Sequence, residues 1–537
     1  MARVRAVGAA GQARWLIWLS SGLLSGMMED TDIHNTAAAP CRAAREEALL
    51  MSNQVSRSLL ERLEEHHREG YLSLHMPGHK ENEALSPYLA RLGAGLDITE
   101  LPGFDDLHDA GGILKESMDR AAALWGSRKS YFQVNGSTGG LLATVRAATR
   151  RGDKVLLARH CHKAIYHAVE VCGLEPVFLL PPVEPTFGLA GSVPPQQVEE
   201  ALAEHPEVKL VVYPSPTYDG VISDTAGICA VAHARGVPVL VDEAHGAHLG
   251  FHPAFPPGAM TQGADLAVAS LHKMLPSLTQ TAILHASGRL VPIPQVARQT
   301  GIFQSSSPSY LLMASMDSCV RLLEERGEEL FSAWHRRLAE LDERLKDLKY
   351  LRCPGHGAEV GACYPGIFAL DPAKILISTR NSALTGVELM GRLREEYHIE
   401  LEMALGHYAV AMTGLGTDDA MPARLAEALL ALDQAAGPCQ EEPAAPSAPY
   451  VLPPRRLSME EAAQAPGGLT FLYDGMGKVC GEYLWAYPPG IPLITPGEEI
   501  TSAVVEAVED IYRAGVRLIG TRGKPPFTTF ALGDQDG

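Results

Sequence analysis

The sequence has little of what marks several large classes of protein. Aromatic residues make up only 6% of its 537 residues, and its nine cysteines form no C-x-x-C pair. An odd number of scattered cysteines indicates neither a disulfide framework nor a zinc ribbon, and we expect a cytoplasmic protein. Basic residues are also scarce: the 45 Lys and Arg residues are outnumbered by 64 Asp and Glu residues, which gives a formal net charge of -19. This balance argues against binding nucleic acid and favours small cationic partners.

Nucleotide and metal motifs are missing as well. The chain contains neither G-x-x-x-x-G-K-[ST] nor G-x-G-x-x-G, which argues against a Walker or Rossmann nucleotide site. His245, His248 and His252 have spacings that could place them on one face of a helix, and imidazole is a common zinc ligand. Gly246 and Gly250 interrupt that helix, and no H-E-x-x-H is present. We therefore expect no metal, and a metal hydrolase remains an alternative that metal analysis would test.

One apolar stretch lies near the N-terminus. Residues 15–24 follow Arg3 and Arg5 and loosely imitate a signal peptide, but they are too few to cross a membrane. The next residues, 29–47, are rich in Ala and charge without periodicity. We expect residues 1–50 to be a disordered or misassigned leader, with Met51 as a plausible alternative start, and we expect no membrane partner.

Beyond this leader, strand-like and helix-like segments alternate. Such alternation is typical of an α/β fold with a mainly parallel sheet covered by helices. The usage of 46% apolar and 20% charged residues is that of a globular protein. The predicted strands cover residues 154–158, 175–180, 208–213 and 237–241. The predicted helices cover residues 162–172, 195–203 and 226–234, with long amphipathic helix over 311–348.

Composition also divides the chain. We expect an N-terminal segment and large domain over residues 51–314 and a smaller α/β domain over residues 315–436. Residues 437–454 are rich in Ala, Pro and Glu, which indicates a linker. A C-terminal α+β domain is expected over residues 455–537.

The most informative stretch is Ser270-Leu271-His272-Lys273. Its lysine follows a strand-like segment, and an earlier buried strand ends in Asp242. A lysine amine can form a Schiff base with the aldehyde of pyridoxal 5'-phosphate, and a carboxylate keeps the pyridine nitrogen protonated so that the ring accepts electrons. Open α/β sheets place functional side chains at strand ends. Each residue alone could be ordinary, but the pair predicts an enzyme that uses this cofactor.

A phosphate-binding turn is the next candidate. Asn135-Gly136-Ser137-Thr138-Gly139-Gly140 follows the short β-like segment 130–134 and precedes a helical stretch. Small residues let the backbone approach an anion, the helix N-terminus offers free N–H groups, and the hydroxyls of Ser137 and Thr138 add donors. A Ser/Thr N-cap with glycines in a turn explains the segment equally well.

A histidine follows the first of the predicted strands. Because Arg159-His160-Cys161-His162-Lys163 comes directly after residues 154–158, His162 could lie over the face of a cofactor ring. A lone histidine would more often be a core residue, and here its position beside the other elements favours the stacking interpretation.

Together these residues match a known family. The chain resembles the fold-type-I ornithine/lysine/arginine decarboxylases, in the shorter form without an N-terminal receiver-like wing domain. The resemblance covers nearly everything after Met51. The matching segments are HMPGHK at 75–80, DDLH at 105–108, NGSTG at 135–139, HK at 162–163, PTYDG at 216–220, VDEAHGAH at 241–248, SLHK at 270–273, PPGIP at 488–492 and PGE at 496–498.

The resemblance implies a fold-type-I large domain with a mainly parallel seven-stranded sheet. It makes Lys273 the Schiff-base lysine, Asp242 the partner of the pyridine nitrogen and His162 the stacking imidazole. It also implies a homodimer or higher homo-oligomer with a shared active site, because Ser305 lies in a segment that reaches the phosphate of a neighbouring subunit. Further cofactor contacts are expected from Ser137, Thr138, Ser270, His272, His245 and Thr217.

The expected activity is decarboxylation of a basic L-amino acid in polyamine metabolism. Arginine giving agmatine is favoured, with lysine giving cadaverine or ornithine giving putrescine close behind. A buried substrate cation needs a carboxylate, for which Asp105, Asp106 and Glu498 are candidates, although surface charges or helix caps explain each equally well. Lys273 or His162 could return the proton to Cα. The alternatives are an aminotransferase, a carbon–sulfur lyase or a non-catalytic regulator that binds the cofactor.

Overall fold

The computed structural model describes residues 57–82, 84–85, 87–355, 363–440, 451–487 and 490–533. The expected leader lies outside the described residues, as do part of the expected linker and Pro488 and Pro489. Among the helices in the described part of the chain, none combines the length and the apolar character needed to span a membrane.

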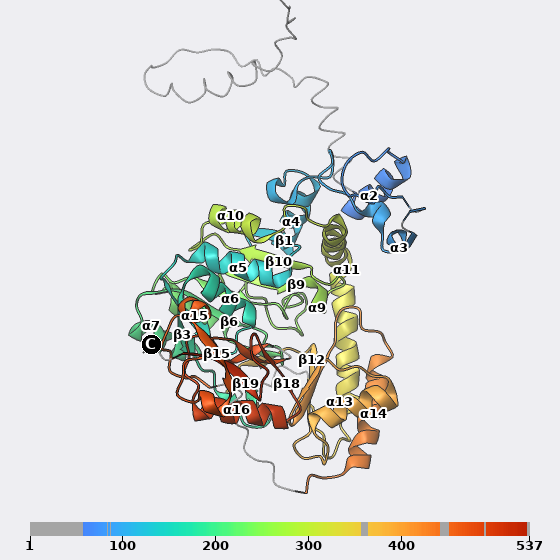
Figure 1. Cartoon of the computed structure of the whole chain (residues 1–537). Helices are drawn as coiled ribbons and strands as arrows, with labels where there is room; N and C mark the ends of the chain where they lie inside the picture. Colours follow the sequence, from blue (N-terminus) through green and yellow to red (C-terminus); the bar gives the residue numbers. More distant parts are fainter. Residues whose placement is uncertain are drawn as a thin grey trace, which may run out of the picture. The chain divides into compact units, whose positions relative to one another are not determined.

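A seven-stranded sheet forms the centre of the fold (Figure 1). Its strands are β1 Lys129–Gln133, β2 Lys154–Ala158, β3 Glu175–Leu179, β6 Val208–Pro214, β8 Val239–Asp242, β9 Leu266–Ser270 and β10 Ala282–Ala286. Their order is β1-β10-β9-β8-β6-β2-β3, and only the pairings of β10 are antiparallel. The predicted seven-stranded, mainly parallel sheet is thus confirmed.

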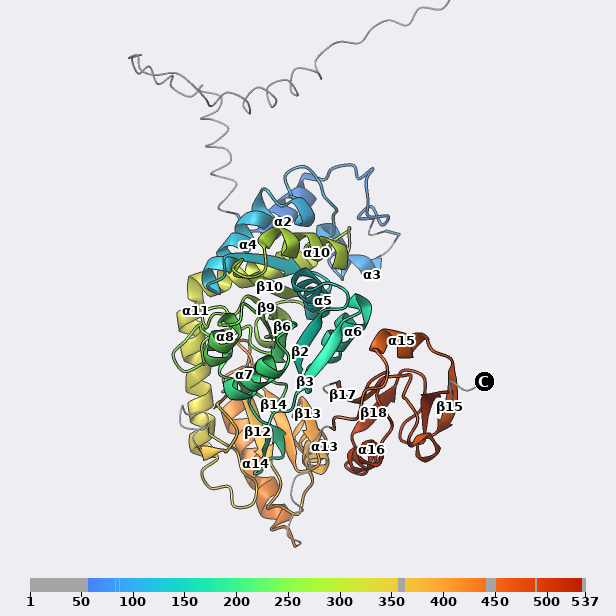
Figure 2. The same cartoon turned by 90° about the vertical axis from the view of Figure 1, so that its left-hand side faces the viewer.

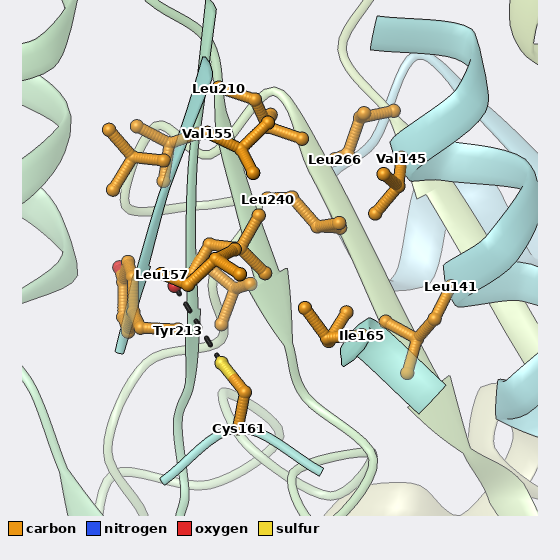
Figure 3. Close-up of a cluster of buried hydrophobic side chains, with 14 of the residues drawn as sticks. Leu141, Val145, Val155, Leu157, Cys161, Ile165, Leu210, Tyr213, Leu240 and Leu266 are labelled. Carbon is orange, nitrogen blue, oxygen red and sulfur yellow. Dashed lines mark hydrogen bonds between the residues drawn. The ribbon is translucent and has the colours of Figure 1, made fainter. Parts of the chain in front are cut away.

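The apolar strand sequences explain why this sheet is central. Every residue of β8 and β9 is buried, as expected for parallel strands with both faces covered. In Figure 3, Leu157, Leu210 and Leu240 of three neighbouring strands pack with Leu141 and Ile165 of the covering helices. This core fixes the carboxyl ends of the strands at one edge of the sheet.

Helices cover this sheet on both sides. They are α4 Ile113–Leu124, α5 Gly136–Ala148, α6 Lys163–Cys172, α7 Pro195–Glu204, α8 Thr225–His233, α9 Leu271–Met274 and α10 Ile293–Phe303. Figure 2 shows α7 and α8 on one side of the strands, with α5 and α6 on the other. The turn into α5 needs Gly136, whose φ of +69° is in the left-handed region.

The chain before the sheet is mostly short helices. These are α2 Leu59–Glu69, α3 Pro87–Ala90, η1 Ala94–Leu96 and η2 Leu107–Asp109. A capping box begins α2, since Ser58 and Glu61 exchange hydrogen bonds between side chain and backbone. The helix packs against the long helix α11, Tyr310–Arg344.

A second, three-stranded sheet lies at the other end of α11 (Figure 1). Its elements are β12 Lys374–Ser378, β13 Met403–Leu405, β14 Tyr408–Met412, α13 Gly386–Tyr397 and α14 Met421–Ala436. It has its own core, in which Leu341 of α11 packs with Leu389 and Leu429. Two short strands, β7 Val221–Ile222 and β11 Ala369–Leu370, form a separate antiparallel pair. The hairpin of β4 Val183–Glu184 and β5 Leu189–Ala190 lies in the connection between β3 and α7.

The C-terminal residues form two small sheets and two helices. The elements are α15 Met459–Gln464, β15 Gly467–Phe471, η3 Tyr473–Gly475, β16 Leu484–Tyr487, β17 Ile491–Ile494, α16 Ser502–Arg513, β18 Arg517–Gly520 and β19 Thr528–Leu532. Glu498 joins this region to the central sheet, because its carboxylate accepts hydrogen bonds from Arg159 at 2.7 and 3.0 Å and from Arg455 at 3.1 Å.

The predicted elements agree closely with those observed. Residues 154–158 are β2 as predicted, and the predicted helices at 162–172 and 195–203 are α6 and α7 to within one residue. The long helix α11 starts at Tyr310 and runs without a break through residues 314 and 315. The domain boundaries stay predictions.

Candidate active site

A cavity of about 580 Å³ lies at the carboxyl ends of the parallel strands. Its walls come from the central sheet, the three-stranded sheet and the C-terminal region. The lining residues used below are Gly136, Ser137, Thr138, His162, Thr217, Tyr218, Asp219, Asp242, His245, Ser270, His272, Lys273, Glu402 and Tyr487.

Strand ends place most of the predicted side chains in this cavity. Asp242 is the last residue of β8, Ser270 is the last residue of β9, and Lys273 follows in the short helix α9. Thr217 lies in the loop after β6, and His162 follows β2 and caps α6. The structure thus brings these residues together, along with Ser137, Thr138, His245 and His272.

Asp242 and Lys273 form the charged centre of the cavity. Burial raises the pKa of Asp242, while Lys273 and a hydrogen bond from the Ala244 N–H lower it. Burial lowers the pKa of Lys273, and the carboxylates of Asp242 and Glu402 oppose that shift. The amine of Lys273 is therefore easier to deprotonate than an exposed lysine, as a nucleophile requires.

His162 is held as a neutral, flat ring. Its Nδ1 accepts a hydrogen bond from the backbone N–H of Ala164 at 3.2 Å, so Nε2 carries the ring proton. Burial lowers its pKa to about 3, with nearby Lys273 adding to the shift. A neutral imidazole at this strand end suits stacking on an aromatic ring.

Hydroxyl groups gather where α5 and α9 begin. Ser137 and Ser270 share a hydrogen bond between their side-chain oxygens. The backbone N–H groups in the first turn of α5 add the positive end of a helix dipole. His272 donates from Nδ1 to the carbonyl oxygen of Thr281 at 2.8 Å, which fixes its ring beside them. These groups suit an anion.

The residues fit pyridoxal 5'-phosphate. One end of the cavity offers hydroxyl groups and a helix N-terminus for a phosphate, and a buried carboxylate is available for a pyridine nitrogen. Lys273 supplies an amine for an aldehyde. Thr217 accepts a hydrogen bond from the Val221 N–H at 3.0 Å, which leaves its own hydroxyl hydrogen to donate to a ring oxygen.

A second lysine reaches the same histidine as Lys273. Nζ of Lys273 lies 2.9 Å from Nε2 of His245, and Nζ of Lys374 lies 3.0 Å from Nδ1 of the same ring. Burial lowers the pKa of Lys374 to about 8 and holds that of His245 well below its usual range. Lys374 starts β12 in the other sheet, and no local motif marked it in the sequence.

Glu402 is another residue that the sequence did not reveal. It precedes β13, lines the cavity and accepts a hydrogen bond from the hydroxyl of Tyr218. The Tyr218 ring packs edge-on against His245 with 4.8 Å between centroids. Tyr218 lies in the matched segment 216–220, from which only Thr217 was predicted to contact the cofactor, whereas Glu402 lies in no matched segment.

The three predicted substrate carboxylates lie outside this cavity. Asp105 accepts hydrogen bonds from the N–H groups of Gly111 at 2.9 Å and Gly112 at 2.8 Å. Asp106 caps η2, and Glu498 is fully buried with its arginines. None of the three lines the cavity, so the prediction that they meet the substrate has no support within one chain.

Ser305 also lies outside the cavity. It is exposed, and its hydroxyl oxygen accepts a hydrogen bond from the Ser307 N–H at 3.1 Å. Its carbonyl oxygen accepts a hydrogen bond from His108 Nε2 at 2.8 Å. The segment 105–108 and the segment around Ser305 are therefore neighbours on the surface.

The histidine cluster does not gather around one point. His245 contacts the two lysines, and His248 bonds Oδ1 of Asp371 at 2.8 Å. Within the described ranges, no group of three or more His, Cys, Asp or Glu side chains could hold a metal ion.

Comparison with known protein families and proteins adds independent findings. The family model "Orn/Lys/Arg decarboxylase, major domain" matches residues 58–354. An arginine decarboxylase of Bacillus anthracis is 31% identical over 478 residues, which cover 87% of this chain and 95% of that protein. An arginine decarboxylase of Halalkalibacterium halodurans is 32% identical over 476 residues, covering 88% of this chain and 96% of that protein.

Solved structures share the fold at lower identity. The lysine decarboxylase of Francisella novicida aligns with a TM-score of 0.74 and 17% identity, covering 92% of this chain and 84% of that one. The constitutive lysine decarboxylase of Escherichia coli gives the same TM-score and coverage with 19% identity. An aminotransferase of Bacillus subtilis aligns with a TM-score of 0.51 and 16% identity over 66% of this chain and 92% of its own.

Proposed function

Because the chain belongs to the Orn/Lys/Arg decarboxylase family, we propose that it converts L-arginine into agmatine and CO2 with pyridoxal 5'-phosphate. The observation that carries the proposal is the cavity that Asp242 and Lys273 both line, Asp242 at the end of β8 and Lys273 just after the adjacent parallel strand β9. The two relatives reported above, both named arginine decarboxylase, support arginine as substrate. Lysine is the second candidate, since a Pseudomonas aeruginosa lysine decarboxylase is 28% identical over 332 residues.

Eight of the ten predicted cofactor residues would hold the cofactor within one chain. Lys273 would bond the aldehyde carbon, and Asp242 would hold a proton on the pyridine nitrogen. His162 would cover one face of the ring, and Thr217 would donate to the ring oxygen. When bound, the cofactor supplies a sink for the electron pair left on Cα as CO2 departs. The phosphate would be held by Ser137, Thr138, Ser270 and His272.

The same residues favour one proton donor over the other. His162 has a pKa of about 3 and already uses Nδ1 as an acceptor, so it holds no spare proton at neutral pH. With substrate bound, Nζ of Lys273 would be a free amine that carries a proton. We assign the return of the proton at Cα to Nζ of Lys273.

Glu402 is the carboxylate we assign to the substrate cation. It lines the cavity, and its Oε1 accepts from Tyr218, which leaves Oε2 for a second donor. A guanidinium group offers planar paired donors that match a carboxylate, which is consistent with arginine. Asp219 also lines the cavity, but it is buried and accepts from the Tyr408 hydroxyl at 2.9 Å.

We also propose that the protein is a homodimer in the cytoplasm. Large apolar side chains before the first strand are exposed, including Leu72 at 83% and Leu74 at 84%, as expected of a surface that a second copy covers. Ser305 and Asp106 lie close together on the surface through the His108 contact, so both could serve the partner's cavity.

The test is a product assay on the purified full chain with pyridoxal 5'-phosphate. Arginine, lysine and ornithine are supplied in parallel, and CO2 and amines are measured together with the visible absorbance of bound cofactor. We expect agmatine and CO2 from arginine, and no product from Lys273→Ala, while the control Lys209→Met, at an exposed position of β6, stays active. Bound cofactor without CO2 from any of the three substrates would contradict the proposal and favour an aminotransferase, a lyase or a regulator.

A further inference from the structure

We propose that a second cavity of this protein binds an aliphatic cation, an amine or a guanidine. The cavity lies within the C-terminal region and has a volume of about 570 Å³. Four aromatic side chains line it, those of Phe471, Tyr473, Tyr512 and Phe527, and we call it the aromatic cavity. Its described lining residues all differ from those of the active site, so the proposal goes beyond the proposed function.

The four rings are exposed, although the chain has few aromatic residues. Their exposed fractions range from 50% for Tyr512 to 66% for Phe471. Eight Phe and Tyr side chains are exposed in the described part of the chain, and half of them line this one cavity. Exposed apolar surface that gathers in one place marks a site where another molecule binds.

Secondary-structure elements hold the rings in place (β15 and α16 in Figure 2). Phe471 ends β15, and Tyr473 begins η3. Tyr512 lies in the last turn of α16, and Phe527 directly precedes β19. The N–H of Leu472 donates to the carbonyl oxygen of Phe527 at 3.0 Å, and the rings of Tyr512 and Phe527 meet edge to face with 6.1 Å between centroids. The cavity is therefore formed before a ligand arrives, which lowers the entropic cost of binding.

A buried carboxylate fixes the loop that presents Phe527. Glu482 is 1% exposed, and its Oε2 accepts hydrogen bonds from the N–H groups of Arg522 at 2.7 Å and Gly523 at 2.8 Å. Its Oε1 accepts one from the N–H of Phe530 at 2.6 Å. Buried polar contacts thus hold the loop on both sides of Phe527, although the ring itself is exposed.

Carboxylates outnumber cations at the aromatic cavity. Asp474 and Glu509 line it, together with one basic side chain among the described residues, Arg513. Arg513 donates to Glu509 and to Asp510, the second at 3.2 Å. These three carboxylates and one guanidinium leave two negative charges, and Asp474 is exposed. The negative end of the α16 dipole lies at the same place, because Tyr512 and Arg513 are in its last turn.

Aromatic faces and carboxylates together favour a cation. The face of an aromatic ring carries the negative part of its quadrupole and attracts an ammonium or guanidinium group within about 6 Å of the centroid. Carboxylates bind the same groups through charge-assisted hydrogen bonds, and both features repel an anion. Among the described residues, the protein's own cations over aromatic rings lie over Phe104, Phe178, Tyr487 and Phe530. The cation that fits the aromatic cavity is therefore one that a ligand brings.

The apolar lining favours a ligand with an aliphatic stem. Methylene groups can pack against the rings and against Pro526 while the charged end meets Asp474. A volume of about 570 Å³ is typical of small-molecule sites, which measure about 300–1,000 Å³. Agmatine, the proposed product, is such a cation, and only this choice of ligand rests on the proposed function.

The test measures binding of agmatine and putrescine to the full chain loaded with pyridoxal 5'-phosphate, by titration calorimetry. Butanediol, in which hydroxyl groups replace both amines of putrescine, is the neutral control ligand. The variants are Asp474→Asn, Tyr512→Leu and Tyr512→Phe, with Asp347→Asn as the matched control at an exposed position outside the cavity. Leu keeps apolar volume without an aromatic face, whereas Phe keeps the face.

We expect Asp474→Asn and Tyr512→Leu each to weaken amine binding about 3- to 10-fold, because each removes one contact to the cation. Tyr512→Phe should stay within about twofold of the wild type, Asp347→Asn should match it, and butanediol should not bind. All variants should keep the wild-type kcat and KM for arginine, since Asp474 and Tyr512 lie outside the active site. Amine that enters the active site binds there equally in all of these proteins, so the differences report the aromatic cavity alone.

Three results would overturn the inference. One is an equal amine affinity of the wild type, Asp474→Asn and Tyr512→Leu. Another is binding of butanediol as strong as that of putrescine, which would make the cavity an apolar site without preference for a cation. The third is a smaller oligomer of Tyr512→Leu by sedimentation, which would assign the rings to a contact between copies of the chain. The titrations need no turnover, so a protein that binds amines as expected but releases no CO2 from arginine refutes the proposed function alone.

Discussion

The hydroxyl of Tyr218 donates a hydrogen bond to the carboxylate of Glu402 across the active-site cavity. The loop after β6 of the central sheet carries Tyr218, and Glu402 precedes β13 of the three-stranded sheet. The pair therefore places an acidic group opposite Lys273 and orients one of its oxygens. In the proposed function, this carboxylate provides the negative charge that a basic amino acid needs.

Glu402→Gln should weaken substrate binding. A hydrogen bond to a charged partner contributes about 1.5–3 kcal/mol, which corresponds to a rise in the KM for arginine of about 10- to 100-fold. Steady-state kinetics would measure it, with Glu400→Gln as the control because its partner Arg394 and Glu400 itself are both exposed. An unchanged KM would show that Glu402 does not meet the substrate cation.

Asp242→Asn should remove most of the activity while leaving the fold intact. The amide has nearly the size of the carboxylate but cannot hold a proton on the pyridine nitrogen as a charged partner does. We expect kcat to fall about 100-fold or more, with cofactor still bound by Lys273. Product formation and visible absorbance check this, and Asp347→Asn at an exposed position serves as control. A variant with wild-type kcat would refute the assigned role.

Glu498→Gln should destabilise the protein. Its carboxylate lies between Arg159 and Arg455, and Arg159 and Glu498 are fully buried. Removing the anion from a buried ion pair typically costs about 3–5 kcal/mol, because the remaining cation has no compensation. Urea unfolding would show a lower midpoint, whereas Glu499→Gln should cost about 1 kcal/mol or less because its partner Arg456 is exposed. Equal midpoints for the two variants would contradict this.

Glu243 should make stability depend on pH. Burial raises its pKa to about 8, against the opposing hydrogen bond from the Ala259 N–H. Since the unfolded chain binds fewer protons than the folded one between about pH 4.5 and pH 8, stability falls as pH rises through that range. The slope from this residue is at most about 1.4 kcal/mol per pH unit.

Glu243→Gln should remove that part of the pH dependence. Urea midpoints of the wild type and the variant at pH 5 and pH 8 give the measurement, with exposed Glu199→Gln as control. The free energy of unfolding should differ less between pH 5 and pH 8 in the Gln variant than in the wild type, by a few kcal/mol. If the wild type and Glu243→Gln lose stability equally, Glu243 is not protonated in the folded protein.

The central sheet and the residues at its strand ends were predictable from the sequence. An apolar run such as residues 154–158 is enough to predict a buried strand. The alternation of strands and helices then predicts that Asp242 and Lys273 both lie at strand ends. The resemblance gave the decarboxylase family, which the match over residues 58–354 confirms. These are properties of single segments or of their order along the chain.

The remaining active-site residues depend on how distant segments dock. Lys374 begins β12 and Glu402 precedes β13, both more than 100 residues after Lys273, and no local pattern marks them as neighbours of the strand-end residues. Glu498 was predicted to contact the substrate. Its actual partner, Arg159, lies 339 residues earlier in the chain, and no local sequence pattern indicates that the two form a buried ion pair. The hydrogen bonds that Asp105 accepts from backbone N–H groups likewise depend on its own φ of +69°, which no local sequence pattern predicts.

The two lysines that meet at His245 come from sheets with separate hydrophobic cores, one around β8 and β9 and the other around β12 and β14. Each core can gather its own apolar residues during folding, whereas the trio exists only after the sheets have docked. Docking of such units takes milliseconds to minutes. Capture of the cofactor during refolding would therefore be a late event, and its time course would follow the assembly of the two sheets into one enzyme.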